Sequence, residues 1–272
     1  MTAVNIAIQK RAVHIMTDGL SYNKEGLVVE VSPKCWALPS LNAAVACMGP
    51  SLANIITAAE FTKRFSSFDE MIAGLEEAMP KIYIANLSLL TENGGGIPDT
   101  RIYIGGWSEG RNRPEAYSIL CIPPDSLQYW YKTHEKQKAE FGEKSVVADE
   151  PFKLVPLDDV IMNPPFAAGL TGEQCGFKAS KATMADTLDP EVDMVVMLQM
   201  QRLREEPLRP GLPATSKVGG HALLTSIDAG GIRQRVVHRW PADKIGEVIA
   251  PEHNTDWKAF RRELKGRRRW WK

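Results

Sequence analysis

The segment MTAVNIAIQKRAVHIMTDG, residues 1–19, contains two short apolar runs separated by a basic turn. The runs cover residues 3–9 and 12–17, and they predict a hairpin of two strands joined near Lys10-Arg11. Both strands are apolar on both faces for much of their length, which is typical of a sheet that is covered on both sides. We therefore expect this hairpin to lie between other layers of a folded domain.

The rest of the chain predicts further strands and helices around this hairpin. Strands are expected at 35–38 and 41–48, at 101–107, 115–122, 126–132 and near 152–156, and in a last hairpin of 218–228 with 232–240. Helices are expected after Gly49-Pro50, from Ser67 to about Leu90, from Asp189-Pro190, and near 256–265. The small residues at 43–46 would let another layer approach closely. This order of elements favours a layered α+β sandwich.

The composition is that of an ordinary soluble globular protein. Of 272 residues, 44% are hydrophobic and 24% are charged, which excludes wholesale disorder. No apolar run approaches the roughly 20 residues of a membrane helix, and residues 1–5 do not resemble a secretory signal. The four cysteines lie far apart without a CxxC pair, as expected for reduced thiols in the cytoplasm. No cofactor is expected, because the sequence has no nucleotide-binding fingerprint and no histidine spacing typical of a metal site.

Basic residues are concentrated at the C-terminal end. Residues 257–272 contain eight basic residues and one acidic residue, whereas the rest of the chain contains 25 basic and 32 acidic residues. Such a tail could bind nucleic acid or an acidic partner, and Trp270-Trp271 could stack on bases. The alternative, which we favour, is a solvated terminal helix whose tryptophans pack back on the body.

Strand geometry brings four residues from the first part of the chain toward one another. If the first hairpin folds about residue 10, Thr2 lies opposite Asp18 at the end of the sheet away from the turn. If the second hairpin folds about residues 39–40, Lys34 falls near the end of its partner strand, one or two residues from Gly49. Provided that both hairpins share one sheet, Thr2, Asp18, Lys34 and the backbone of Gly49 gather at one edge.

This spacing resembles that of proteasome β subunits and their simpler bacterial relatives, which are N-terminal-nucleophile hydrolases. The matching positions, within about the first 90 residues, are Thr2, Thr17-Asp18-Gly19, Pro33-Lys34, the small-residue strand that ends at Met48-Gly49, and the two following helices. Beyond them the order of elements agrees, including the Gly219-Gly220 pair that opens the last hairpin. The resemblance implies a four-layer αββα sandwich of two antiparallel sheets flanked by helices, formed by residues 1–250. By its composition, the basic, tryptophan-rich segment 251–272 follows this domain as a C-terminal helix or tail. Because family members assemble into rings, the resemblance also implies a homo-oligomer.

The resemblance further implies a peptide or amide hydrolase with Thr2 as its nucleophile. A threonine hydroxyl needs a base, and the α-amino group of an N-terminal threonine can serve within the same residue. The ordinary pKa of that amine is about 7.7–8.0, and the ammonium of Lys34 would lower it while Asp18 holds the lysine in place. A backbone N–H group at Gly49 would help to bind the oxyanion. This chemistry requires removal of Met1, because with Met1 retained the base is an amide.

Departures from the family pattern leave other functions open. Active β subunits usually place an aspartate and a serine just before the Gly-Gly pair, whereas residues 215–220 read Thr-Ser-Lys-Val-Gly-Gly, and Met48 stands where glycine is common. The alternative is a non-catalytic protein of the same fold that acts in assembly or as a scaffold and binds a partner through its basic tail. Residues 49–53, Gly-Pro-Ser-Leu-Ala, are also a near match to the G-x-S-x-G motif of serine hydrolases, with His221 and His238 downstream. The last position of that motif is alanine here, and Ser51 is more simply a helix cap.

Overall fold

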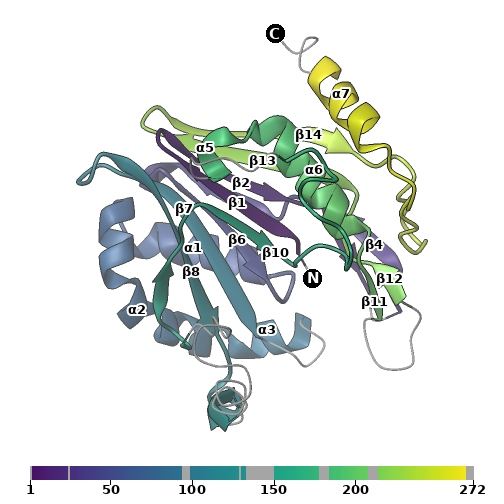
Figure 1. Ribbon diagram of the computed structural model, residues 1–272. Helices are drawn as coiled ribbons and strands as arrows, with labels where there is room; N and C mark the ends of the chain where they lie inside the picture. Colours follow the sequence, from purple (N-terminus) through teal and green to yellow (C-terminus); the bar gives the residue numbers. More distant parts are fainter. Residues whose placement is uncertain are drawn as a thin grey trace.

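The computed structural model describes residues 2–23, 25–93, 99–128, 130–132, 150–177, 184–207 and 214–267. In this part of the chain, two five-stranded antiparallel sheets pack face to face, and helices cover the outer face of each sheet (Figure 1). The layers therefore follow the order helix, sheet, sheet, helix. The prediction of a four-layer αββα sandwich is confirmed.

The first sheet contains the N-terminal hairpin and has the strand order β10-β1-β2-β13-β14. Its strands are β1 Val4–Gln9, β2 Ala12–Thr17, β10 Val160–Asn163, β13 His221–Asp228 and β14 Gly231–Arg239. Helix α6, Pro190–Arg202, covers its outer face and contacts β1, β2, β13 and β14. The short helix α5, Met184–Thr187, contacts β1, and α7, Trp257–Arg267, packs on α6. Asp189 accepts a hydrogen bond from the N–H of Glu191 and so caps α6 where the Asp-Pro pair predicts its start.

The second sheet has the strand order β5-β6-β7-β8-β9. Its strands are β5 Cys35–Leu38, β6 Ala43–Met48, β7 Thr100–Ser108, β8 Arg113–Cys121 and β9 Leu154–Pro156, and the 3-10 helix η1, Pro39–Leu41, joins β5 to β6. Helices α1, Ala53–Arg64, and α2, Phe68–Ala85, cover its outer face, and α3, Leu87–Asn93, follows α2. Two further ladders have two strands each, β3 Leu20–Tyr22 with β4 Val28–Val31, and β11 Glu205–Pro207 with β12 Ala214–Ser216.

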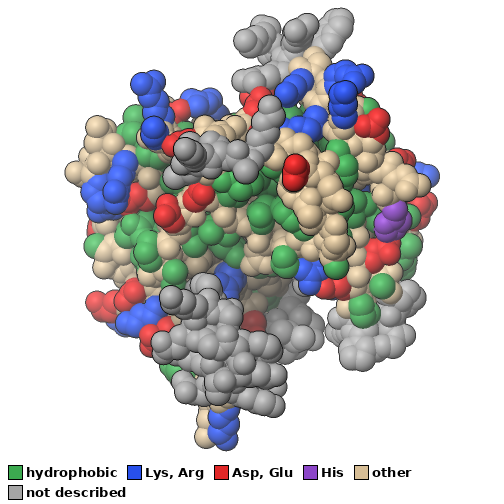
Figure 2. All heavy atoms as spheres, in the orientation of Figure 1, with side chains coloured by type: hydrophobic (Ala, Val, Ile, Leu, Met, Phe, Trp, Pro, Cys, Tyr) green, Lys and Arg blue, Asp and Glu red, His purple; other side chains and the backbone are tan. Residues whose placement is uncertain are grey.

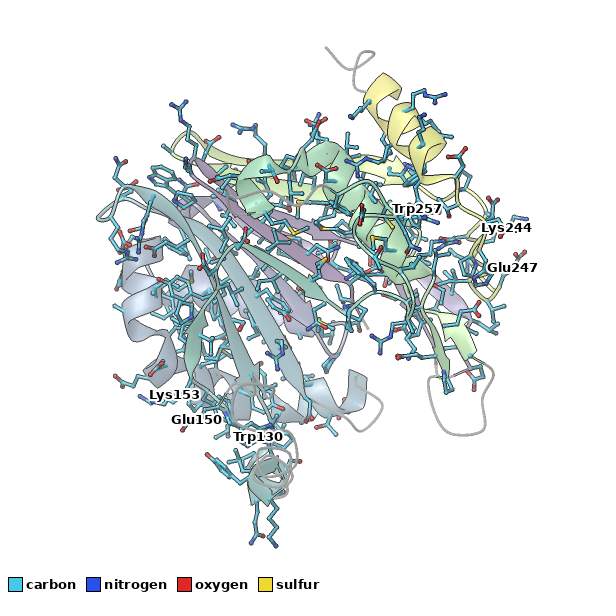
Figure 3. All side chains as sticks on the ribbon, viewed as in Figure 1. Trp130, Glu150, Lys153, Lys244, Glu247 and Trp257 are labelled. Atoms are coloured by element: carbon cyan, nitrogen blue, oxygen red, sulfur yellow. The ribbon has the colours of Figure 1, made fainter. Side chains whose placement is uncertain are left out.

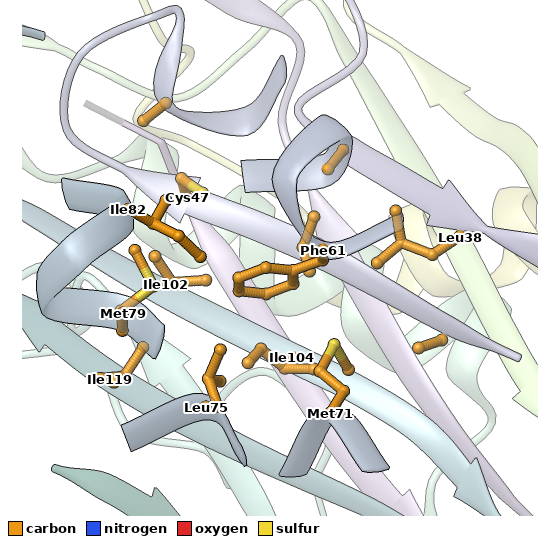
Figure 4. Close-up of a cluster of buried hydrophobic side chains, with 14 of the residues drawn as sticks. Leu38, Cys47, Phe61, Met71, Leu75, Met79, Ile82, Ile102, Ile104 and Ile119 are labelled. Carbon is orange, nitrogen blue, oxygen red and sulfur yellow. The ribbon is translucent and has the colours of Figure 1, made fainter. Parts of the chain in front are cut away.

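Apolar side chains fill the space on both sides of the second sheet. On the helix side, Phe61 of α1 lies among side chains of α2 and of the strands (Figure 4). Between the two sheets, Ala44 and Ala46 of β6 share a buried cluster with Ile15 of the first sheet. A Cβ atom on Gly105 of β7 would lie 3.0 Å from the Ile15 side chain, tighter than most contacts of a Cβ atom. The small residues on β6 thus permit the close approach of layers that the sequence predicts.

Two predicted elements differ from the structure. The strand predicted at 126–132 is wrong, because residues 124–128 and 130–132 are helical. The preceding Pro123-Pro124-Asp125 is typical of a helix N-terminus, where the fixed φ of proline is suited to the first turn and its missing N–H costs nothing. The single helix expected from Ser67 to about Leu90 is divided at Asn86, the residue that ends α2.

The C-terminal helix is attached to the body of the protein. Arg261 of α7 forms an ion pair with Asp193 of α6, and Leu264 is buried in the apolar cluster around α6. Trp257, at the start of α7, packs on the same cluster (Figure 3), whereas Trp270-Trp271 lies outside the described residues. Within the described part of the chain, no helix is long and apolar enough to cross a membrane. All four cysteines are free and buried.

Candidate active site

Asp18 and Lys34 form a buried ion pair next to the start of the described chain. Both carboxylate oxygens of Asp18 lie 3.0 Å from Lys34 Nζ, and the two side chains are 0% and 7% exposed. Asp18 also accepts hydrogen bonds from the backbone N–H groups of Ala3, at 2.9 Å, and Leu20, at 3.3 Å. A buried carboxylate needs such partners, because an unpaired charge out of water is strongly unfavourable. The pair therefore holds the backbone beside Thr2 as well as the lysine.

Thr2, Lys34 and Gly49 line one cavity of about 730 Å³. Thr2 is 5% exposed and precedes β1, Lys34 precedes β5, and Gly49 follows β6. The volume lies within the range of about 300–1,000 Å³ that is usual for ligand sites. Apolar side chains such as Trp36 and Ile55 form another part of the lining. Three of the four residues singled out in the sequence thus share a cavity. The fourth, Asp18, does not line it but accepts a hydrogen bond from Lys34, which does.

The residues meet by a different route from the predicted one. Val4 of β1 pairs with Thr17 of β2, so Ala3 rather than Thr2 is level with Asp18, one residue away from the predicted register. Cys35 of β5 pairs with Ala46 of β6, which places Lys34 near the end of its partner strand, as predicted. The two hairpins belong to different sheets, so the assumption of one shared sheet is wrong. The residues come together because both hairpins end at the same edge of the sandwich.

Gly49 occupies a position where the backbone permits no other residue without strain. Its φ is +142°, and a Cβ atom there would lie 2.6 Å from the backbone oxygen of Asp99. One turn further on, the Asn54 side chain of α1 accepts a hydrogen bond of 2.7 Å from the N–H of Cys47 at the end of β6. These constraints therefore fix the backbone conformation of the segment between β6 and α1, which forms part of the cavity wall.

A second buried ion pair holds the Gly219-Gly220 segment against the turn that contains Asp18. Arg202, at the end of α6, lies 2.5 and 2.9 Å from the carboxylate oxygens of Asp243, and the side chains are 4% and 1% exposed. Arg202 also donates to the carbonyl of Val218, and Asp243 accepts from the N–H of Gly220, both at 2.7 Å. The carbonyl of Gly219 in turn accepts from the N–H of Gly19 at 3.1 Å. The sequence gives no signal for this network, because Arg202 and Asp243 lie 41 residues apart.

The two serines considered in the sequence lie in different places. Ser216 is buried, and its Oγ lies 3.3 Å from both the carbonyl oxygen and the amide nitrogen of Val218, away from the residues that line the cavity. Ser51 lines the cavity together with Thr2, but neither His221 nor His238 does. Among the described residues, the cavity therefore provides no histidine base for a serine nucleophile.

Several polar atoms close to Asp18 are buried without a hydrogen-bond partner in the described part of the chain. They are Thr17 Oγ1, Tyr22 Oη and both ring nitrogens of His221. The His221 ring lies on Gly19, where a Cβ atom would come within 2.2 Å of it. The ring thus packs against the turn that carries Asp18, and only glycine leaves room for it. The sequence predicts no such role for His221.

Replacing His221 with phenylalanine should remove a dependence of stability on acid pH. Burial lowers the pKa of His221, an effect that Asp18 opposes and that Arg239 and Lys34 reinforce. When the pKa of a histidine is lower in the folded protein than its unfolded value of about 6.5, the free energy of unfolding decreases as the pH falls below that value. The decrease is at most about 2 kcal/mol near pH 5. Phenylalanine fills a similar space and does not titrate. Thermal unfolding of both proteins near pH 7.5 and near pH 5 measures the difference, and equal pH dependences would contradict the prediction.

No protein-family model and no curated protein matches this sequence. Among solved structures, the chain is similar to a Gly-1 mutant of Anbu from Hyphomicrobium sp. strain MC1, with 10% identity and a TM-score of 0.51 over 99% of this chain and 95% of that chain. Anbu from the same strain is similar at 9% identity and a TM-score of 0.51, over 98% of this chain and 95% of that one. At such low identity the likeness concerns the fold alone. The likeness extends over almost the whole length of both chains and is compatible with the resemblance in the sequence.

Proposed function

We propose that this protein is an N-terminal-nucleophile hydrolase that cleaves amide bonds, with Thr2 as nucleophile after removal of Met1. The observation that carries the proposal is the buried Asp18–Lys34 ion pair beside a cavity that Thr2 lines. A buried lysine that is paired and aimed at a cavity is a costly feature, and such features are concentrated at functional sites. Met1 itself lies outside the described residues.

The reaction requires only groups that the processed chain contains. The α-amine of Thr2 takes the proton of Thr2 Oγ1 as that oxygen attacks the carbonyl carbon of the substrate. The C–N bond then breaks, the amine transfers the proton to the leaving nitrogen, and an ester with Thr2 remains. A water molecule, which gives its proton to the same amine, hydrolyses the ester and restores the free threonine. Substrate bonds broken and formed therefore balance without a cofactor.

The neighbouring residues supply the electrostatics of this proposal. The Lys34 ammonium disfavours a second positive charge beside it, so it lowers the pKa of the Thr2 amine and keeps it a base at neutral pH. Asp18 fixes Lys34 through two contacts of 3.0 Å and does not itself line the cavity. The N–H of Gly49, held in the cavity wall, donates to the oxyanion.

The substrate of the proposed enzyme is a peptide or a smaller amide. Trp36 and Ile55 line the cavity and are 39% and 46% exposed, so they favour an apolar group next to the amide that is cleaved. The resemblance to proteasome β subunits supports a homo-oligomer, with a ring as one form. It also supports a catalytic domain of residues 1–250, and residues 251–272 then form a basic C-terminal helix and tail, of which α7 packs on that domain.

The intact mass of the untagged protein, purified from its own host, tests the first requirement of the proposal. We expect a mass lower than that of the full sequence by one methionine, because threonine is small enough for methionine to be removed before it. The same sample should release the fluorophore from peptide amides. A mass that retains Met1 would overturn the proposed mechanism, since Thr2 would then have no free amine.

One observation favours a second candidate, a non-catalytic assembly or scaffold protein of the same fold. The aspartate that active β subunits place before the Gly-Gly pair is absent and the serine is displaced to Ser216, and the Arg202–Asp243 ion pair holds that segment instead. This candidate predicts a protein that assembles but hydrolyses no amide. Removal of residues 257–272 tests its second part, because a protein that binds through its tail must then lose its partner.

A further inference from the structure

A second cavity, of about 390 Å³, lies between α7 and the segment 174–176. Its lining consists of Gln174, Cys175, Gly176, Trp257, Lys258, Arg261, Arg262 and Lys265. It shares no residue with the cavity that Thr2 lines, and α7 packs on the outer side of α6, so the two cavities are separate. The lining has four basic side chains, one tryptophan and no acidic side chain.

The basic residues line the cavity because they lie on one face of the helix. Lys258, Arg261, Arg262 and Lys265 follow one another at spacings of three, four and seven residues from the first, so their side chains project from the same side of α7. Arg261 is neutralised by Asp193. In the described part of the chain, the other three form no ion pair with an acidic side chain. Figure 2 shows Lys and Arg side chains gathered over α7.

Contacts of Arg261 hold α7 against the segment 174–176 that forms the other wall of the cavity. The guanidinium of Arg261 donates to the carbonyl of Cys175 at 3.2 Å and lies 5.3 Å from the ring centroid of Phe177. Gly176 has a φ of +85°, and a Cβ atom there would lie 3.1 Å from the Arg261 side chain. The glycine therefore both allows the turn and leaves room for the arginine. Arg261 and the segment 174–176 are therefore in place before a ligand binds, whereas the exposed side chains of Lys258, Arg262 and Lys265 become ordered on binding.

We propose that this cavity binds a nucleotide unit, with its phosphate held by Lys258, Arg262 and Lys265 and its base against the indole of Trp257. A phosphate monoester carries a charge of about −1.5 to −2 on three acceptor oxygens, which suits three unpaired cations around a small cavity. An acidic peptide would satisfy the cations, but its acidic side chains have no aromatic ring to stack on the tryptophan. Stacking of a base on an aromatic ring is worth about 1–3 kcal/mol in single-strand recognition, and arginine adds a cation–π contribution.

Binding of AMP, ribose 5-phosphate and a short single-stranded RNA to the full-length protein at low salt tests this inference. The double charge reversal Arg262→Glu with Lys265→Glu changes two exposed side chains and should weaken binding of AMP by about tenfold or more. The matched control is Lys63→Glu with Lys132→Glu, which makes the same change of net charge at exposed positions away from α7 and should alter binding by less than about twofold. Neutral variants, Arg262→Gln with Lys265→Gln, should give a smaller loss of the same sign.

Each probe answers a different part of the proposal. AMP should bind more tightly than ribose 5-phosphate, because only AMP has a base; equal affinities would overturn the assignment of the base to Trp257. Competition between AMP and the RNA shows whether both bind in this cavity. The tighter of the two indicates whether a free nucleotide or a strand supplies the nucleotide unit, and either result supports the site. Absence of binding to the wild-type protein, or unchanged binding to the charge-reversed variant, would overturn the proposal. A changed oligomeric state of that variant with unchanged AMP binding would show that α7 contacts a second copy instead.

Discussion

Replacing Thr2 with alanine should abolish amide hydrolysis while the protein remains folded. The substitution removes the only hydroxyl that the proposed mechanism uses as a nucleophile, and we expect the rate to fall by a factor of about 1,000 or more. The free α-amine remains, so the loss would be due to the hydroxyl alone. Initial rates with a fluorogenic peptide amide, measured after the intact mass confirms removal of Met1 from both proteins, give the comparison.

Two matched variants show whether the effect belongs to Thr2. Thr2→Ser keeps a hydroxyl next to the same amine and should retain measurable hydrolysis. Ser51→Ala removes the other hydroxyl discussed as a nucleophile, which lines the same cavity, and should leave the rate nearly unchanged. A Thr2→Ala variant with the wild-type rate would overturn the hydrolase mechanism and favour the non-catalytic protein. Loss of activity in Ser51→Ala alone would favour the serine-hydrolase alternative.

The parts of the fold that the sequence predicts well are those fixed by neighbouring residues. The first hairpin turns near Lys10-Arg11 because two apolar runs flank a polar pair, and the structure has these strands with almost the predicted bounds. Helix α6 starts after Asp189 because the aspartate side chain caps the first turn and the fixed φ of Pro190 suits the first helical position. The strand predicted at 126–132 is wrong because a short apolar and aromatic run is compatible with either a strand or a helix. The local signal that distinguishes them is the proline-rich start, which favours a helix.

The parts of the site that the sequence does not predict depend on how the sheets are stacked. Nothing local assigns the hairpins of Thr2 and Lys34 to different sheets, so their convergence follows from the sandwich and not from strand pairing. The strands β1 and β2 pair one residue away from the predicted register, so Ala3 and not Thr2 is level with Asp18. Asp18 reaches the N–H of Ala3 at 2.9 Å and so positions the backbone next to the nucleophile. His221 and the Arg202–Asp243 pair are likewise brought to the Asp18 turn only by the last hairpin and α6.

Replacing Asp18 with asparagine should lower the free energy of unfolding by about 3–5 kcal/mol, the usual cost of leaving one member of a buried ion pair without its partner. Asparagine has nearly the same shape, so the packing around the turn is kept and the change is mainly one of charge. The Lys34 ammonium, whose side chain is 7% exposed, would then have no carboxylate at 3.0 Å. Urea unfolding monitored by circular dichroism measures the loss. The exposed pair Arg64–Glu60 provides the control, and Arg64→Met should cost less than about 1 kcal/mol.

A double-mutant cycle separates the ion pair from other effects of these substitutions. Lys34→Met alone leaves Asp18 with the backbone donors of Ala3 and Leu20, so it should cost less than Asp18→Asn alone. The double variant Asp18→Asn with Lys34→Met has no unpaired charge and should be more stable than the sum of the single losses predicts, by about 1–3 kcal/mol. Additive losses would show that the two residues do not stabilise each other. A double variant that is folded and stable but hydrolyses no amide would show that the charged Asp18–Lys34 pair serves the reaction and not the fold.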